Sequence, residues 1–178
     1  MKHALPARKE MGIRTAFNIL GPLSNPAGAD YQIVGVFDGG ITGKVAAVLS
    51  RLGVERAMVV HGFDGLDEIT LTGPTKVSEL RDGWIRDYEL DPAELGLSYC
   101  EPDALKGGEL KTNCKIALSI LHGERSPRRD IVLLNSAAAI YTSGASGSMK
   151  SALDIAATSI DTGAAMKKLE QLIQYTGD

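Results

Sequence analysis

Two short apolar runs on either side of a helical pattern constrain the fold of this chain more than any other feature. Residues 32–37 and 57–60 form compact runs of β-type residues, which is typical of buried strands. Between them, Thr42 is expected to cap a helix that ends before Gly53. One apolar face of this helix is expected to carry Val45, Val48, Leu49 and Leu52. A strand, a helix and a strand at this spacing predict a βαβ unit, with two parallel strands joined by a right-handed crossover.

The remainder of the chain adds a hairpin and several helices. Arg81-Asp82-Gly83 separates two β-like runs, residues 76–80 and 84–90, and Asp-Gly in this position indicates an antiparallel hairpin. Beyond the hairpin, the patterns predict a helix at 106–121, a buried strand at 130–134 and helices at 135–141, 149–160 and 163–175. The sequence therefore predicts a three-layer α/β fold, in which a mostly parallel sheet is flanked by helices and carries one antiparallel hairpin.

Composition excludes several classes of protein. The hydrophobic content of 44% and the charged content of 23% are ordinary for a soluble globular domain. The net charge of −3 gives no broad basic field, so nucleic-acid binding is not expected. Cys100 and Cys114 show no metal-ligand spacing and are interpreted as reduced thiols. No stretch approaches the roughly 18 apolar residues of a membrane span, and the start lacks the apolar core of a signal peptide. A cytoplasmic protein is predicted.

An acidic loop follows the second apolar run. Residues 64–68 read DGLDE, so two adjacent carboxylates, Asp67 and Glu68, lie just beyond a predicted buried strand. In open α/β sheets, ligands bind at the carboxyl ends of the strands. Mg²⁺ usually takes one or two protein carboxylates and leaves its other positions to water and substrate phosphates. The pair is therefore a candidate Mg²⁺ site, with an ordinary solvated acidic turn as the alternative.

Several ordered motifs carry a resemblance to a known family. Residues 8–15 (RKEMGIRT) and 17–27 (FNILGPLSNPA) closely resemble anthranilate phosphoribosyltransferase of tryptophan biosynthesis. The family's pattern is also matched by His61-Gly62 with residues 64–68, Gly107-Gly108 with Asn113, residues 129–135 and residues 160–170. These motifs are spread over essentially the whole chain, so chance similarity is a poor explanation.

The resemblance implies an enzyme and a domain organisation. Members of this family transfer a phosphoribosyl group from 5-phosphoribosyl-1-pyrophosphate (PRPP) to the amine of anthranilate. They are typically Mg²⁺-dependent homodimers, with a small helical domain followed by a large α/β domain. This chain resembles the C-terminal part of the large domain, as a single domain over residues 1–178. The family's glycine-rich diphosphate loop, Gly-Thr-Gly-Gly-Asp, does not occur in the sequence, so the chain alone is expected to be inactive.

Four residues match positions that bind substrate or metal in the family. Arg8 matches the arginine that grips the anthranilate carboxylate, and a guanidinium fork suits a planar carboxylate. Pro22 matches a proline that lines the anthranilate channel, within residues 21–28, which are expected to form a tightly set loop. Asp67 and Glu68 match the acidic pair that holds Mg²⁺ against the diphosphate. No covalent nucleophile is implied, so no catalytic side chain is predicted.

Two other functions compete with this one. The first is a non-catalytic relative that uses the same fold to bind nucleic acid or a protein partner. Arg8, the Asp67-Glu68 pair and the acidic charge balance oppose it. The second is a pyrimidine-nucleoside phosphorylase, which shares the fold. It would not be expected to combine the loop at residues 21–26 with the acidic pair at this spacing.

Overall fold

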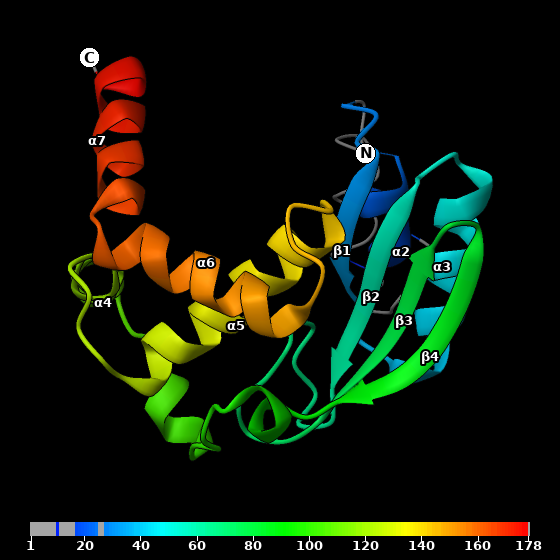
Figure 1. Ribbon diagram of the computed structural model, residues 1–178, viewed down its shortest axis with the longest axis horizontal. Coiled ribbons are helices and arrows are strands. Elements are labelled where there is room, and N and C mark those ends of the chain that lie inside the picture. Colours follow the sequence, from blue (N-terminus) through cyan, green and yellow to red (C-terminus); the bar gives the residue numbers. More distant parts are fainter. Residues whose placement is uncertain (1–9, 11–16, 25–26, 178) are drawn as a thin grey trace.

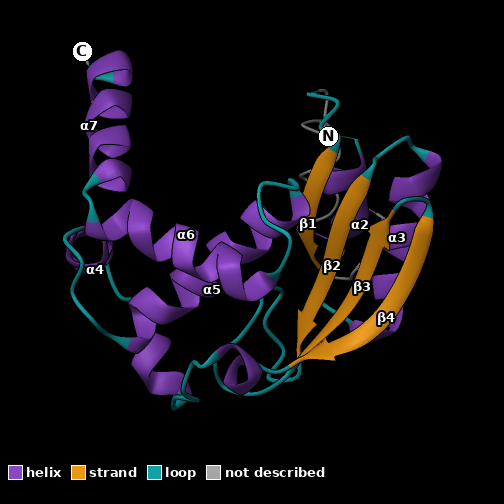
Figure 2. Cartoon of the chain, in the orientation of Figure 1, coloured by secondary structure: helices purple, strands orange, loops and turns teal. Residues whose placement is uncertain are grey.

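A small mixed sheet at one side of the molecule carries the first half of the fold, and helices continue from it (Figure 1). The computed structural model describes residues 10, 17–24 and 27–177. In Figure 2 the strands lie together, and the two C-terminal helices extend away from them. Among the described residues, no helix is both long and apolar enough to cross a membrane.

The sheet has four strands in the order β1 (Tyr31–Gly35), β2 (Arg56–Gly62), β3 (Thr75–Arg81) and β4 (Trp84–Leu90). β1 and β2 are parallel, while β2 with β3 and β3 with β4 are antiparallel. The α/β class, the βαβ unit and the hairpin are thus confirmed. The sheet is mixed rather than mostly parallel, because residues 63–74 contain no helix and residues 130–134, which were expected to form a further strand, are helical. A parallel neighbour needs a long crossover, usually helical, whereas this connection brings β3 back beside β2 in the opposite direction.

Helix α3 (Thr42–Arg51) covers one face of the sheet. Its buried Val45 and Leu49 pack with Val34, Val59 and Leu80 of the strands in one hydrophobic cluster. The apolar stripe is narrower than predicted, since Val48 and Leu52 are exposed.

The start of α3 also differs from the prediction. A short 3₁₀ turn, η2 (Gly39–Ile41), precedes the helix, and the Asp38 side chain accepts the Gly40 N–H at its start. Thr42 therefore lies inside α3 rather than capping it, and its hydroxyl donates to the Gly39 carbonyl at 3.1 Å.

Helix α5 (Pro127–Thr142) covers the opposite face and completes the three layers. Its Leu134 and Ala138 are fully buried against a cluster that includes Met58, Val60 and Val77 of the sheet. A strand at 130–134 was therefore the wrong prediction. Ser126 caps the helix by accepting the Arg129 N–H, and Pro127 occupies the first turn. A short apolar run fits a buried helix face as well as a strand, and this cap selects the helix.

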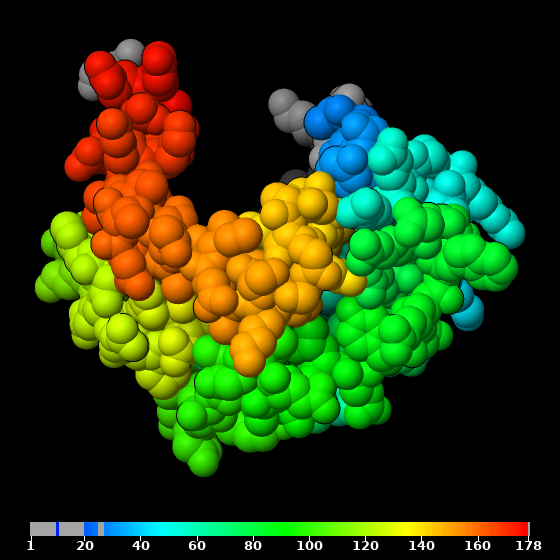
Figure 3. Space-filling model, in the orientation of Figure 1, coloured from blue at the N-terminus to red at the C-terminus, as the bar shows by residue number. Residues whose placement is uncertain are grey.

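The remaining elements flank these layers. Helix α2 (Phe17–Leu23) precedes β1, and the 3₁₀ turns η3 (Pro92–Leu95) and η4 (Pro102–Leu105) follow β4. Helices α4 (Leu110–Leu121), α6 (Met149–Asp161) and α7 (Ala164–Thr176) confirm three predicted helices. Pro22, predicted to lie in a loop, instead occupies the last turn of α2. In Figure 3, α7 projects beyond the rest of the surface.

Candidate functional site

The carboxyl ends of β1 and β2 meet at one rim of the sheet, and the acidic loop leaves from this rim. The Val36 N–H donates to the Val60 carbonyl at 3.0 Å, which extends the parallel ladder past the end of β1. Nδ1 of His61 lies 2.8 Å from the Val36 carbonyl oxygen. His61 thus ties the two strand ends together, in keeping with a structural role.

Asp64 organises the inside of this loop. Its carboxylate accepts hydrogen bonds from the hydroxyls of Thr70, at 2.6 Å, and Thr72, and from the Leu66 N–H at 3.1 Å. Burial alone would raise the pKa of Asp64, but these hydrogen bonds outweigh it and lower the pKa below its ordinary value. The Asp64 carboxylate therefore stabilises the loop, and its hydrogen bonds within the loop leave it less suited than Asp67 and Glu68 to bind a metal.

Gly35 allows the loop to approach the end of β1. A Cβ added at Gly35 would lie 1.6 Å from the Asp67 carbonyl oxygen, far inside any tolerated contact. Only glycine fits a position that another backbone approaches so closely. The absence of a side chain at position 35 thus sets where Asp67 lies.

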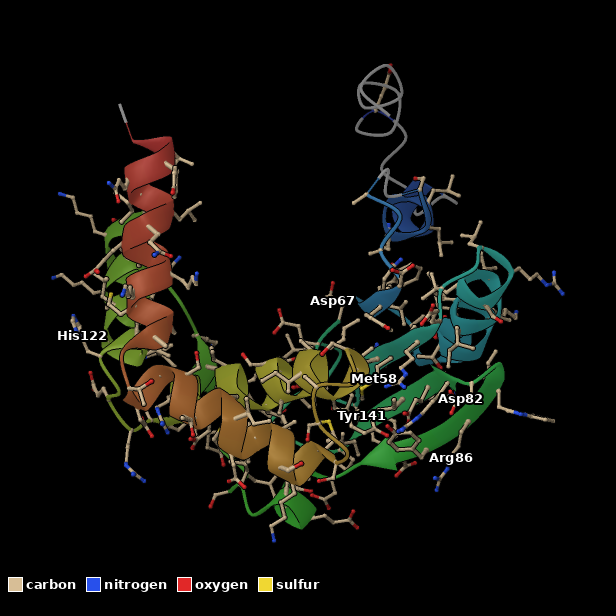
Figure 4. All side chains as sticks on the ribbon, turned by 45° about the horizontal axis from the view of Figure 1, so that its top comes forward. Met58, Asp67, Asp82, Arg86, His122 and Tyr141 are labelled. Carbon is tan, nitrogen blue, oxygen red and sulfur yellow. The ribbon has the colours of Figure 1, made fainter. Side chains whose placement is uncertain are left out.

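Two of the predicted site residues line one cavity. A pocket of about 210 Å³ is bounded by Pro22, Val34, Gly35, Val36, Phe37, Ile41 and Asp67. Its wall combines the end of α2, the end of β1 and the acidic loop. Figure 4 labels Asp67, which lies near the N-terminal elements of the fold. Glu68 is the next residue along the loop and is exposed. Arg8 lies outside the described residues.

The two carboxylates fit a hard cation by their chemistry. Asp67 and Glu68 are exposed, and neither side chain has a hydrogen bond or ion pair among the interactions of the described residues. Within the same part of the chain, no group of three or more His, Cys, Asp or Glu side chains could hold a metal by itself. Such a pair suits Mg²⁺, which leaves most of its coordination to water and phosphate oxygens.

Two structural residues of this site were not identified from the sequence. Gly35 is one, because its role depends on the close approach of a loop more than 30 residues away. Asn135 is the other, because its side chain bonds to the loop from α5. The apolar run before Asn135 suggested a strand, so this residue was expected at the start of a helix rather than inside one that packs against the loop.

Comparison with known proteins agrees with the motifs. Residues 1–166 match the sequence model of the glycosyl transferase family, a/b domain. The anthranilate phosphoribosyltransferase of Methanocorpusculum labreanum is 53% identical over 177 residues, which cover 99% of this chain and 52% of that protein. The chain thus spans about half the length of the curated relatives it matches.

Solved structures extend this likeness to the fold. The crystal structure of anthranilate phosphoribosyltransferase from Thermus thermophilus has a TM-score of 0.89 at 39% identity, over 98% of this chain and 52% of that one. The Saccharomyces cerevisiae enzyme in complex with PRPP and Mg has a TM-score of 0.88 at 29% identity, over 98% of this chain and 50% of that one. The resemblance found in the motifs is confirmed, and the chain belongs to the glycosyl transferase family whose α/β domain matches residues 1–166.

Proposed function

We propose that this chain supplies the Mg²⁺-binding loop and part of the anthranilate-binding wall of an anthranilate phosphoribosyltransferase. The reaction is the transfer of phosphoribosyl from PRPP to the amine of anthranilate, in tryptophan biosynthesis. The observation that carries the proposal is the cavity that Pro22 and Asp67 line together. The names of the relatives, and the PRPP and Mg complex of the yeast enzyme, support the same substrates and metal.

Asp67 and Glu68 would hold the metal. When bound there, Mg²⁺ would neutralise the charge of the diphosphate and orient it as a leaving group. The chain's own contribution is to place two exposed carboxylates, free of other partners among the described residues, at the rim of the sheet. Gly35 and Asp64 set the path of the loop that carries them.

Arg8 and Pro22 would orient the acceptor. The guanidinium of Arg8 matches the planar anthranilate carboxylate through two parallel hydrogen bonds. Pro22, at the end of α2, gives the cavity a rigid apolar edge. This arrangement needs no covalent nucleophile, because holding two reactants in line can lower a barrier by about 7–11 kcal/mol.

The wider setting follows the same proposal. Residues 1–178 would form the C-terminal part of a phosphoribosyltransferase α/β domain, and the active enzyme would be a homodimer. A cytoplasmic location stays a prediction from the composition and from the biosynthetic role.

A chimera tests the proposal. The chain would replace the matching segment of the Methanocorpusculum labreanum relative, which is 53% identical over 177 residues. The chimera is expected to form phosphoribosylanthranilate only when PRPP, anthranilate and Mg²⁺ are all present, whereas the 178-residue chain alone should not. A folded chimera without turnover, beside an active parent enzyme, would overturn the proposed function.

A further inference from the structure

The side chain of Asn135 joins helix α5 to the acidic loop. Its Oδ1 accepts the Ile69 N–H at 3.1 Å, and its Nδ2 donates to the Ile69 carbonyl at 2.8 Å. One amide thus binds both backbone groups of the residue that directly follows Glu68. The two partners lie 66 residues apart in the chain.

Asn135 lies on a helix that is itself fixed. Its Nδ2 also donates to the Ile131 carbonyl one turn earlier, at 3.0 Å, which sets the direction of the side chain. The preceding residue, Leu134, is fully buried, and Ala138 is buried one turn later. Asparagine favours helix ends over helix interiors. Its place inside α5 is explained by the bonds it makes to the loop.

The loop is held on both sides of the carboxylates. Ile69 and Leu71 are fully buried in the cluster that contains Leu134. At the other side, the Asp67 backbone lies against Gly35. The two carboxylates are therefore carried on a short segment between a contact with β1 and a clamp from α5.

We propose that Asn135 is a positioning residue for the Mg²⁺ ligands Asp67 and Glu68. The inference rests on the proposed function and adds a part of the metal site that lies on a different element. Asn135 does not reach the cation. It fixes the backbone next to Glu68, and with it the segment that carries both carboxylates, before metal and PRPP bind. Preorganised ligands bind a metal more tightly than ligands on a loose loop.

Asn113 offers a matched control. Its side chain makes the same pair of hydrogen bonds to one backbone residue: it accepts the Gly108 N–H at 2.8 Å and donates to the Gly108 carbonyl at 2.9 Å. This clamp joins the start of α4 to Gly108 and makes no bond to the acidic loop. Asn113→Leu therefore removes an equivalent amide from another loop.

The test uses Asn135→Leu, Asn135→Ala and Asn113→Leu in the chimera described above. The leucine variant has a similar volume and removes both bonds to Ile69, together with the bond to Ile131. The alanine variant leaves room for water at Ile69 and is the one to use if the leucine variant does not fold. Three quantities are measured: the Mg²⁺ concentration for half-maximal rate, the KM for anthranilate, and Mn²⁺ affinity by electron paramagnetic resonance. Amide hydrogen exchange over residues 66–72 reports the loop directly.

The Asn135 variants should raise the Mg²⁺ half-saturation about ten-fold and weaken Mn²⁺ binding by a similar factor. Exchange over residues 66–72 should become faster, while the KM for anthranilate stays within about two-fold, since its proposed binding group, Arg8, is untouched. Asn113→Leu should leave the metal dependence unchanged. Normal metal dependence in a folded Asn135 variant would overturn the inference.

One further variant separates this inference from the proposed function. If Asp67→Asn with Glu68→Gln also leaves the metal dependence unchanged, the proposed metal site itself is wrong. If the acidic double variant loses Mg²⁺ dependence and the Asn135 variants do not, only the positioning role is wrong.

Discussion

At the scale of single residues, the acidic loop divides its carboxylates between two tasks. Asp64 is occupied by two hydroxyls and a backbone N–H, while Asp67 and Glu68 have no such partners among the described residues. The sequence predicted the last two as metal ligands through the resemblance. It did not predict the task of Asp64, because Thr70 and Thr72 become its partners only once the loop closes.

The pH dependence of stability should report the role of Asp64. Its pKa is lowered below 3.8, so its contribution is present above that value and is lost as the pH falls through the lower folded pKa. Asp64→Asn weakens the hydrogen bonds that the carboxylate accepts and should destabilise the chain by about 1 kcal/mol near neutral pH. The effect is no larger because Asp64 is partly exposed and solvent screens its charge. The difference in free energy of unfolding between the parent chain and Asp64→Asn is measured by urea unfolding at neutral pH and at a pH below the ordinary carboxyl pKa. This difference should be smaller at the lower pH. An equal difference under both conditions would contradict the assignment.

Arg8 gives a second prediction at this scale. In the chimera, Arg8→Ala should raise the KM for anthranilate roughly ten- to a hundred-fold, because the loss of a charged partner costs about 1.5–3 kcal/mol. The KM for PRPP should change little. Lys9→Ala removes the neighbouring positive charge and is the control. Equal effects of the two substitutions on anthranilate would remove the carboxylate-binding role of Arg8.

At the scale of elements, periodicity identified most helices and strands but not the whole of helix α5. The hairpin around Asp82-Gly83 was predictable because Asp82, with φ of 52°, and Gly83, with φ of 79°, suit a tight turn. The run Ile131-Val132-Leu133-Leu134 has no period that separates a buried helix from a strand. Ser126 and Pro127, which form the N-cap and first turn of α5, are the residues that indicate a helix here. The positioning of the acidic loop escaped sequence reasoning because it depends on contacts between elements.

The cap of α5 can be tested by substitution. Ser126→Ala removes the bond to the Arg129 N–H and should lower the free energy of unfolding by about 1 kcal/mol. Ser136→Ala, inside the same helix, removes a hydroxyl that has no capping role and is the control. Urea denaturation of the two variants gives the comparison. If the two variants had the same free energy of unfolding, the Ser126 cap would contribute nothing to the stability of α5.

At the scale of the whole molecule, three separate elements build one cavity. The end of α2 contributes Pro22, β1 contributes Gly35, and the acidic loop contributes Asp67. Sequence motifs identified Pro22 and Asp67 separately, and the fold places them in one wall. We propose that this wall includes a Mg²⁺ site for the phosphoribosyl donor.

A Mg²⁺ titration of the chimera carrying Asp67→Asn with Glu68→Gln tests this metal site. Neutral amides are poor ligands for a hard cation. The Mg²⁺ half-saturation and the KM for PRPP should both rise about ten-fold or more, with little change in the KM for anthranilate. Glu94→Gln with Glu124→Gln removes two other exposed carboxylates as the control. Normal Mg²⁺ dependence and a normal KM for PRPP in the Asp67 and Glu68 variant would show that these carboxylates do not bind the metal.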